Sequence, residues 1–189
     1  MKTRLLLGLF GLALFAQLAV PASMILKRER VLAHGQAFKF RTAPVDPYDA
    51  FRGRYVALGF DRDFVVVPPG HDFARGQTVH VRLEIDAEGF ATLAEILRDR
   101  PDAAPYLTTK IQYIGGNVVH LRLPFDRFYM DEDAAPAAEQ AYWKYTAASN
   151  RNAYVQVRIE KGFAVPEDLY VDGQPIRDYL AAHPQAGAR

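Results

Sequence analysis

Cysteine is absent from this chain of 189 residues, and serine occurs only at Ser23 and Ser149. Without cysteine there is no disulfide, thiolate nucleophile, Cys-ligated zinc or iron–sulfur cluster. The scarcity of hydroxyl and thiol nucleophiles argues against a serine or cysteine hydrolase. A phosphate-cradling glycine-rich loop is also lacking, because the Gly-Gly-Asn stretch at residues 115–117 lies between two predicted strands and fits a hairpin turn.

Excess charge of one sign is lacking as well, since the formal net charge is +1. This balance conceals an asymmetry around an apolar N-terminal segment. Residues 31–189 carry 18 basic and 21 acidic side chains, so the bulk of the chain is slightly acidic. A nucleic-acid partner is therefore not expected. The basic residues that flank the apolar segment are Lys2, Arg4, Lys27, Arg28 and Arg30.

Residues 5–26 form an apolar run broken only by Gln17, Pro21 and Ser23. A helix of this length reaches about 33 Å, which matches the core of a bilayer. A cleaved signal peptide ending before Ser23 is the competing interpretation. The run continues past that point, which favours a retained anchor over residues 1–30. A short basic N-terminus usually stays inside, so we expect residues 31–183 to fold outside the cytoplasm, followed by a flexible tail at 184–189.

Short alternating or apolar runs separated by Gly, Pro and Asp follow the anchor, and this pattern is typical of β-strands joined by turns. One sizeable helix is predicted, at residues 134–147. The fold class is therefore mainly β, with a single inserted helix. The predicted strands cover residues 37–42, 54–60, 64–67, 78–85, 90–98, 108–114, 118–125, 153–161 and 163–171.

Several short motifs occur twice in the same order, which indicates an internal duplication. Residues 53–58 (GRYVAL) match residues 116–121 (GNVVHL), and each is followed by Phe-Asp-Arg. Residues 79–84 (VHVRLE) match residues 155–160 (VQVRIE), and each is followed by Gly-Phe-Ala. We predict two repeats, at 36–101 and 106–175, whose small antiparallel β units pack as one domain about a pseudo-twofold axis.

The stretch from Pro44 to Phe60 (PVDPYDAFRGRYVALGF), together with later matches at residues 75–84 and 169–176, resembles the GDYXXLXY domain family. The resemblance implies a small bacterial protein anchored in the inner membrane, with its domain in the periplasm and a multi-span membrane protein as partner. It implies no chemistry. Arg54 and Phe60 depart from the family's motif, where Asp and Tyr are expected. The motif positions are Pro44, Asp46, Pro47, Arg52, Gly53, Tyr55 and Leu58, and the prolines with the glycine also fit a rigid connector.

The repeated Phe-Asp-Arg motifs supply the most notable polar residues, Asp61 with Arg62 and Asp126 with Arg127. A duplication places the two pairs in equivalent positions, where the carboxylates could share a cleft and act as acid and base on a glycan-like polymer. Alternatively, both pairs are strand-end charges that form local ion pairs.

Three aromatic residues lie close together in the predicted helix: Tyr142, Trp143 and Tyr145. Helical spacing puts the two tyrosines near one face and the tryptophan about 100° away, so one face fits a core and another fits a docking surface. The histidines form no metal signature, although His80 and His120 could meet on one sheet face. The preferred expectation is a non-enzymatic binding or assembly domain that serves an envelope membrane protein, without cofactor or metal.

Overall fold

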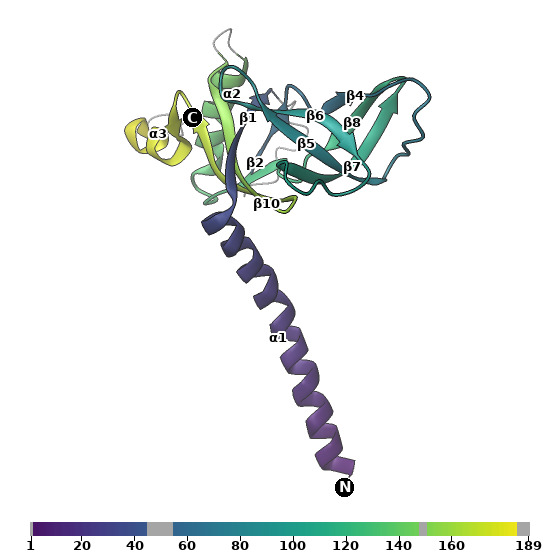
Figure 1. Ribbon diagram of the computed structural model, residues 1–189. Coiled ribbons are helices and arrows are strands. Elements are labelled where there is room, and N and C mark those ends of the chain that lie inside the picture. The colour runs from purple at the N-terminus through teal and green to yellow at the C-terminus, as the bar shows by residue number, and fades with distance from the viewer. Residues whose placement is uncertain (1, 45–54, 148–150, 185–189) are drawn as a thin grey trace.

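The computed structural model describes residues 2–44, 55–147 and 151–184. Its first element, the helix α1 (Lys2–His34), projects away from a β domain that holds the remaining elements (Figure 1). Residues Gly8–His34 contain a stretch that is long and apolar enough to cross a membrane, and none of that stretch is buried in the domain. An apolar helix with no protein around it is what the sequence predicts for an anchor.

The β domain contains two five-stranded sheets and a two-stranded ribbon. The first sheet has the order β12-β11-β10-β1-β3, the second has the order β4-β8-β7-β5-β6, and the ribbon pairs β2 with β9. All of these pairings are antiparallel. The bounds are β1 (Gln36–Ala43), β2 (Tyr55–Ala57), β3 (Gly59–Phe60), β4 (Phe64–Val66), β5 (Thr78–Ile85), β6 (Ala91–Leu97), β7 (Tyr106–Gly115), β8 (Val118–Arg122), β9 (Arg127–Tyr129), β10 (Ala153–Glu160), β11 (Phe163–Val171) and β12 (Gln174–Pro175).

Each five-stranded sheet takes strands from both halves of the chain. In the first sheet, β10 and β11 from the second half pair with β1 and β3 from the first. In the second sheet, β5 and β6 from the first half pair with β7 and β8 from the second. Four consecutive strands thus share one order with the halves exchanged, β11-β10-β1-β3 in the first sheet and β6-β5-β7-β8 in the second. The repeats do not form one sheet each, as we expected. Exchanging the hairpins lets the strands of one half cover the edge strands of the other half.

The short pairings repeat this exchange. In the ribbon, Val56 faces Phe128, and in the second sheet Val119 faces Val65. The residues that the repeat relates are equally buried: Val56 with Val119, Leu58 with Leu121, and Val81 with Val157 all have at most 5% of their surface exposed. Antiparallel pairing with one apolar face per strand accounts for this alternation.

Three aromatic rings, two of them buried and the third partly buried, pack together beside the smaller hollow. Phe125 packs at 4.8 Å from Phe40 and at 5.3 Å from Phe60, between ring centroids. Phe60 and Phe125 begin the two Phe-Asp-Arg motifs, so the repeated phenylalanines meet inside the domain. Edge-to-face packing of this kind adds to the hydrophobic stabilisation of a core.

Two helices cover one end of the β domain (Figure 1): α2 (Ala135–Ala147) and α3 (Ile176–Ala182). The class, mainly β with one inserted helix and a preceding apolar helix, is confirmed. The sequence pattern did not reveal α3, β9 or β12. These elements have seven, three and two residues, too few for a periodic pattern to be distinguished.

One residue, Gly35, separates α1 from β1. Its N–H donates to Val31 O at 2.8 Å, and a Cβ at this position would lie 2.5 Å from the same oxygen. Val31 is 2% exposed, Arg30 pairs with Glu160 at 3.4 Å, and Arg158 Nη1 donates to Gly35 O at 3.2 Å. The helix therefore continues directly into the sheet, and these contacts fix its direction relative to the domain.

Candidate functional site

Two hollows occupy corresponding places in the exchanged sheets. The larger, called here the basic groove, has a volume of about 800 Å³ and lies between the ends of β7 and β8 and the β10–β11 turn. The smaller hollow has a volume of about 190 Å³ and lies between the ends of β1 and β3 and the β5–β6 turn. The scaffold thus builds the same kind of depression twice, once with each half of the chain.

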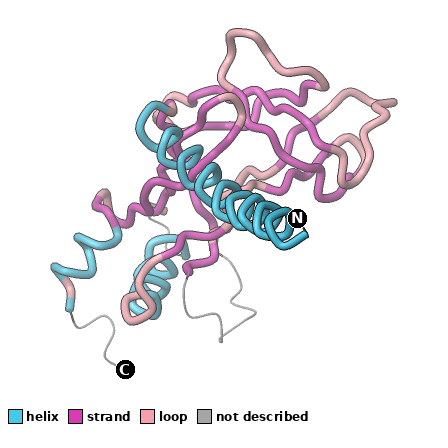
Figure 2. The backbone as a smooth tube through the Cα atoms, turned by 90° about the horizontal axis from the view of Figure 1, so that it is seen from below, coloured by secondary structure: helices cyan, strands magenta, loops and turns pink. Residues whose placement is uncertain are grey.

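Strand register places the two hollows at opposite ends of β1. Gln36, the first residue after the α1 junction, faces Ile159, so the β10–β11 turn lies at the end of the sheet near α1. Arg41, which lines the smaller hollow, lies five residues further along the strand, a distance of about 17 Å. The basic groove is therefore on the side from which α1 leaves the domain, the side seen in Figure 2.

The basic groove is strongly cationic. Within the part of the chain that the structure describes, Asp126 is the single carboxylate that lines it, whereas seven lysine and arginine side chains do. Two of these, Lys27 and Arg28, come from α1, and the others come from the β domain. The remaining five are Arg100, Lys110, Arg122, Arg127 and Lys161.

Aromatic rings flank these cations. Lys27 Nζ lies 4.0 Å from the centroid of the Phe163 ring, and the Arg127 guanidinium lies 4.9 Å from that of Tyr55. A hydrogen bond with Tyr129 is the main cause that raises the pKa of Arg127 above its ordinary value. The walls of the groove therefore combine positive charge with apolar surface.

In the smaller hollow, positive side chains pair with carboxylates. Arg41 pairs with Glu88 and also covers the Phe90 ring at 3.9 Å. Hydrogen bonds from the backbone N–H of Phe90 and Glu88 hold the pKa of Asp86 below its ordinary value. Phe90 is the repeat counterpart of Phe163, so both hollows have a cation over the same phenylalanine. In the smaller hollow that cation is itself neutralised.

The predicted acidic pair is divided between the hollows. Asp61 and Arg62 line the smaller hollow, whereas Asp126 and Arg127 line the basic groove. Asp61 accepts two hydrogen bonds from Arg151 Nη1, at 3.0 and 2.9 Å. The structure does not bring the two carboxylates into either hollow together, and one of them is an ion-pair partner.

We expected Asp61 and Asp126 to be equivalent in the two repeats, and the backbone hydrogen bonds show that they are not. Leu58 N donates to Asp126 O at 2.9 Å, and Leu121 N donates to Asp63 O at 2.7 Å. Since Leu58 and Leu121 are counterparts, the counterpart of Asp126 is Asp63 and not Asp61. The repeated letters Phe-Asp-Arg are offset from the structural repeat because the chain between Leu121 and Phe125 is two residues longer than that between Leu58 and Phe60.

The aromatic residues of α2 divide between core and surface. Tyr142 is 1% exposed, donates its hydroxyl to Ala43 O at 2.8 Å and accepts from Gly59 N at 3.2 Å. Burial raises the pKa of Tyr142 to about 12. Tyr145 packs edge-on against Tyr179, and its hydroxyl donates to Asp172 at 3.2 Å. Trp143 is 37% exposed and is the member of the cluster available for docking.

The histidines have separate partners. His80 bonds Thr108, and its pKa is lowered mainly by burial. His120 bonds Asp63 at 3.2 Å and stacks on Tyr113. Within the described residues, no group of three or more His, Asp or Glu side chains could hold a metal.

The family-motif positions are only partly visible. Asp46, Pro47, Arg52 and Gly53, with most of the predicted connector, lie outside the described residues. Pro44 directly follows β1, and Leu58 is buried in the core. The Tyr55 ring packs 5.6 Å from that of Tyr129, so this motif position lies beside the basic groove.

Sequence reasoning missed the basic groove. Lys110 and Arg122 belong to different strands, Lys161 to a turn and Lys27 to the helix, so no local pattern joins them. The one available signal was the basic cluster directly after the apolar run, which marks a membrane boundary rather than a pocket.

The comparisons with known proteins agree with the resemblance noted from the sequence. No curated protein and no solved structure matches the chain. The model of one family, described as GDYXXLXY protein, matches residues 17–169, which is most of the chain and runs from the middle of α1 into β11. The chain belongs to the GDYXXLXY family.

Proposed function

We propose that this protein is a single-pass, membrane-anchored domain that works outside the cytoplasm by binding rather than by catalysis. The observation that carries the proposal is the α1–β1 junction. A tether that needed only to prevent diffusion would tolerate a flexible linker. Here Gly35 alone connects helix and strand, and Val31, Arg30 and Arg158 tie the junction to the first sheet. A domain held in this way presents one constant face to the bilayer.

Binding is favoured over hydrolysis by the distribution of reactive groups. A pair of carboxylates acting on a glycosidic bond needs a separation of about 5 to 10 Å across one cleft. Asp61 and Asp126 line different hollows, and Asp61 is held by Arg151. The proposed partner is a multi-span membrane protein, since the tether keeps the domain within reach of neighbours in the same bilayer.

The absence of cysteine permits a direct test of topology. Two variants each carry one cysteine. Ala87→Cys lies exposed on the β5–β6 turn, and Thr3→Cys lies at the start of α1. In intact cells, a membrane-impermeant maleimide should label Ala87→Cys, whereas Thr3→Cys should react only after lysis. The mass of the labelled chain should include residues 1–22. Labelling of Thr3→Cys alone would place the domain in the cytoplasm, and loss of the N-terminal residues would replace the anchor by a signal peptide.

The partner is tested by crosslinking in the membrane. A photoreactive amino acid at Trp143 should give a discrete adduct with a membrane protein, and the same group at Arg98, directly after β6, serves as the matched control. Adducts from both positions in equal yield, or from neither, would contradict specific docking through α2.

A further inference from the structure

The basic groove is the strongest unexplained feature of the molecule. We propose that it binds the phosphate-bearing headgroup of an anionic lipid in the leaflet at which α1 leaves the bilayer. The inference rests on the membrane anchoring proposed above, but it concerns a different surface from the partner-docking helix α2. It adds a ligand class that membrane tethering alone does not require.

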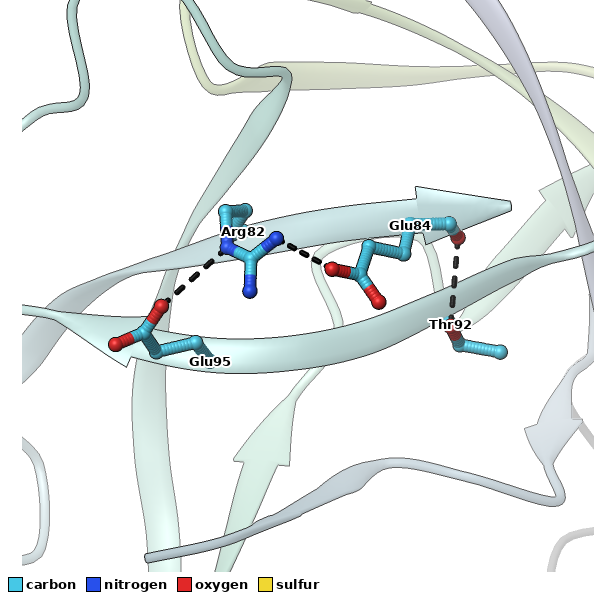
Figure 3. A network of polar contacts seen from close by, with 4 residues as sticks. All are labelled: Arg82, Glu84, Thr92 and Glu95. Carbon is cyan, nitrogen blue, oxygen red and sulfur yellow. Dashed lines mark hydrogen bonds and ion pairs between the residues drawn. The ribbon is translucent and has the colours of Figure 1, made fainter. Parts of the chain in front are cut away.

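The first argument is that two cations of the groove, Lys110 and Arg122, have no carboxylate partner among the described residues. Several arginines elsewhere in the β domain are neutralised by carboxylates. Figure 3 shows Arg82 between Glu84 and Glu95, and Arg158 pairs with Glu167. Among the described residues no ion pair forms at Lys110 or Arg122.

The second argument is the placement of Lys110 directly opposite Arg122 in the β7–β8 pairing. Residues facing each other across antiparallel strands have Cβ atoms about 5 Å apart, and like charges in that arrangement are destabilising. An anion between them converts the repulsion into two attractive contacts. A pair of cations kept against this cost therefore indicates a negatively charged ligand.

The third argument is position. Lys27 and Arg28 directly follow the apolar run of α1, which places them at the height of the lipid headgroups. Phe163 is 40% exposed beneath Lys27, and Tyr129 is 57% exposed on the groove wall. Exposed aromatic rings beside cations are typical of the membrane interface. A ligand that enters the groove at this height comes from the bilayer itself.

The fourth argument concerns the chemistry of the ligand. Arginine binds phosphate through two parallel hydrogen bonds, and lysine adds a point charge. The volume of about 800 Å³ is in the range that holds a whole small ligand. Leu123, Pro124 and Val165 supply apolar wall beside the cations. A phosphodiester headgroup with its adjoining glycerol fits this combination, while its acyl chains remain in the membrane.

The test uses the full-length chain, purified in a neutral detergent and titrated with phosphatidylglycerol while native mass spectrometry counts bound lipid. Wild-type protein should retain one phosphatidylglycerol molecule under conditions that remove phosphatidylcholine. The double variant Lys110→Gln/Arg122→Gln should weaken retention about 30-fold, since each cation near an anionic lipid surface contributes about a factor of five. The matched control is Lys39→Gln/Arg62→Gln, which removes the same charge from β1 and from the wall of the smaller hollow and should bind as wild type.

Three results would overturn the proposal. Equal loss in both double variants would indicate a general charge effect, and no loss in either would exclude the groove. Binding of glycerol 3-phosphate or inorganic phosphate as tightly as of phosphatidylglycerol would make the ligand a soluble anion. A groove variant that is at least as stable as wild type, by unfolding followed with circular dichroism, shows that lost binding is not lost structure. Failure of the anchoring proposal appears separately, as a mature chain without α1.

Discussion

The basic groove and the smaller hollow are built from corresponding parts of the two halves, yet they differ in size and charge. Both lie beside a hairpin turn of the opposite sheet, and both hold a cation over a phenylalanine. In the smaller hollow, carboxylates on the β5–β6 turn neutralise that cation, as Arg41 with Glu88 shows. At the basic groove, the cation comes from α1, and most of the lining is positive. The comparison teaches that the scaffold tolerates either solution, a depression in which charges pair or one lined mostly by cations.

The largest expected effect concerns α2, which is present only in the second half and joins the first sheet through Tyr142. Replacing Tyr142 by Ala should lower the free energy of unfolding by about 4 kcal/mol, because it leaves a cavity and removes the partners of Ala43 O and Gly59 N. Trp143→Ala should cost about 1 kcal/mol or less. Urea titration of both variants in detergent, followed by circular dichroism, gives the difference. Equal losses would mean that α2 contributes no surface for docking.

The two hairpin turns provide the next test. Gly162 has φ of +79°, and a Cβ there would overlap Tyr106 and Thr108 on β7. Gly89, its counterpart, has φ of +84° but no heavy atom within 4 Å of such a Cβ. We expect Gly162→Ala to destabilise the protein by about 3 kcal/mol, from backbone strain and overpacking, and Gly89→Ala by about 1 kcal/mol from strain alone. Thermal unfolding of the two variants checks this, and a larger loss in Gly89→Ala would contradict the docked turn.

A smaller, pH-dependent effect belongs to the Arg158–Glu167 pair, next to the groove residue Pro166. The hydrogen bond from Arg158 is the main cause that lowers the pKa of Glu167. A carboxylate with a lowered folded-state pKa stabilises the protein above its unfolded pKa, and this contribution is lost as the pH falls through the folded pKa. At pH 7 the free energy of unfolding of wild type should exceed that of Glu167→Gln by about 1 kcal/mol. The difference should disappear in acid. A difference that is constant from pH 7 to pH 3 would show that Glu167 acts through packing.

The smallest expected effect has the opposite sign. Removing the repulsion between Lys110 and Arg122 should raise the free energy of unfolding of the lipid-free protein by about 0.5 kcal/mol. The control variant Lys39→Gln/Arg62→Gln should change the free energy of unfolding by less than about 0.5 kcal/mol. Denaturant titration in a neutral detergent measures both. A stability loss in Lys110→Gln/Arg122→Gln would mean that the two cations have a structural role.

Much of the fold could be predicted because its cause is local. Alternation in β5 and β10, and helical spacing in α2, report burial directly from neighbouring residues. The exchange of hairpins could not be predicted, since Val81 and Val157 alternate in the same way whichever half they pair with. The groove was invisible for a related reason. Lys110 and Arg122 are ordinary exposed strand residues until the β7–β8 register sets them face to face, and only the junction at Gly35 brings Lys27 beside them.

The most direct test of the account is the distance of each hollow from the bilayer. The full-length chain with a fluorophore on Tyr129→Cys, in the basic groove, or on Ala87→Cys, on the turn beside the smaller hollow, is reconstituted in nanodiscs containing lipid spin-labelled at the headgroup. We predict strong quenching at position 129 and little at position 87, because strand β1 separates the two hollows along its length. Equal quenching at both positions, or stronger quenching at position 87, would contradict a groove that faces the membrane.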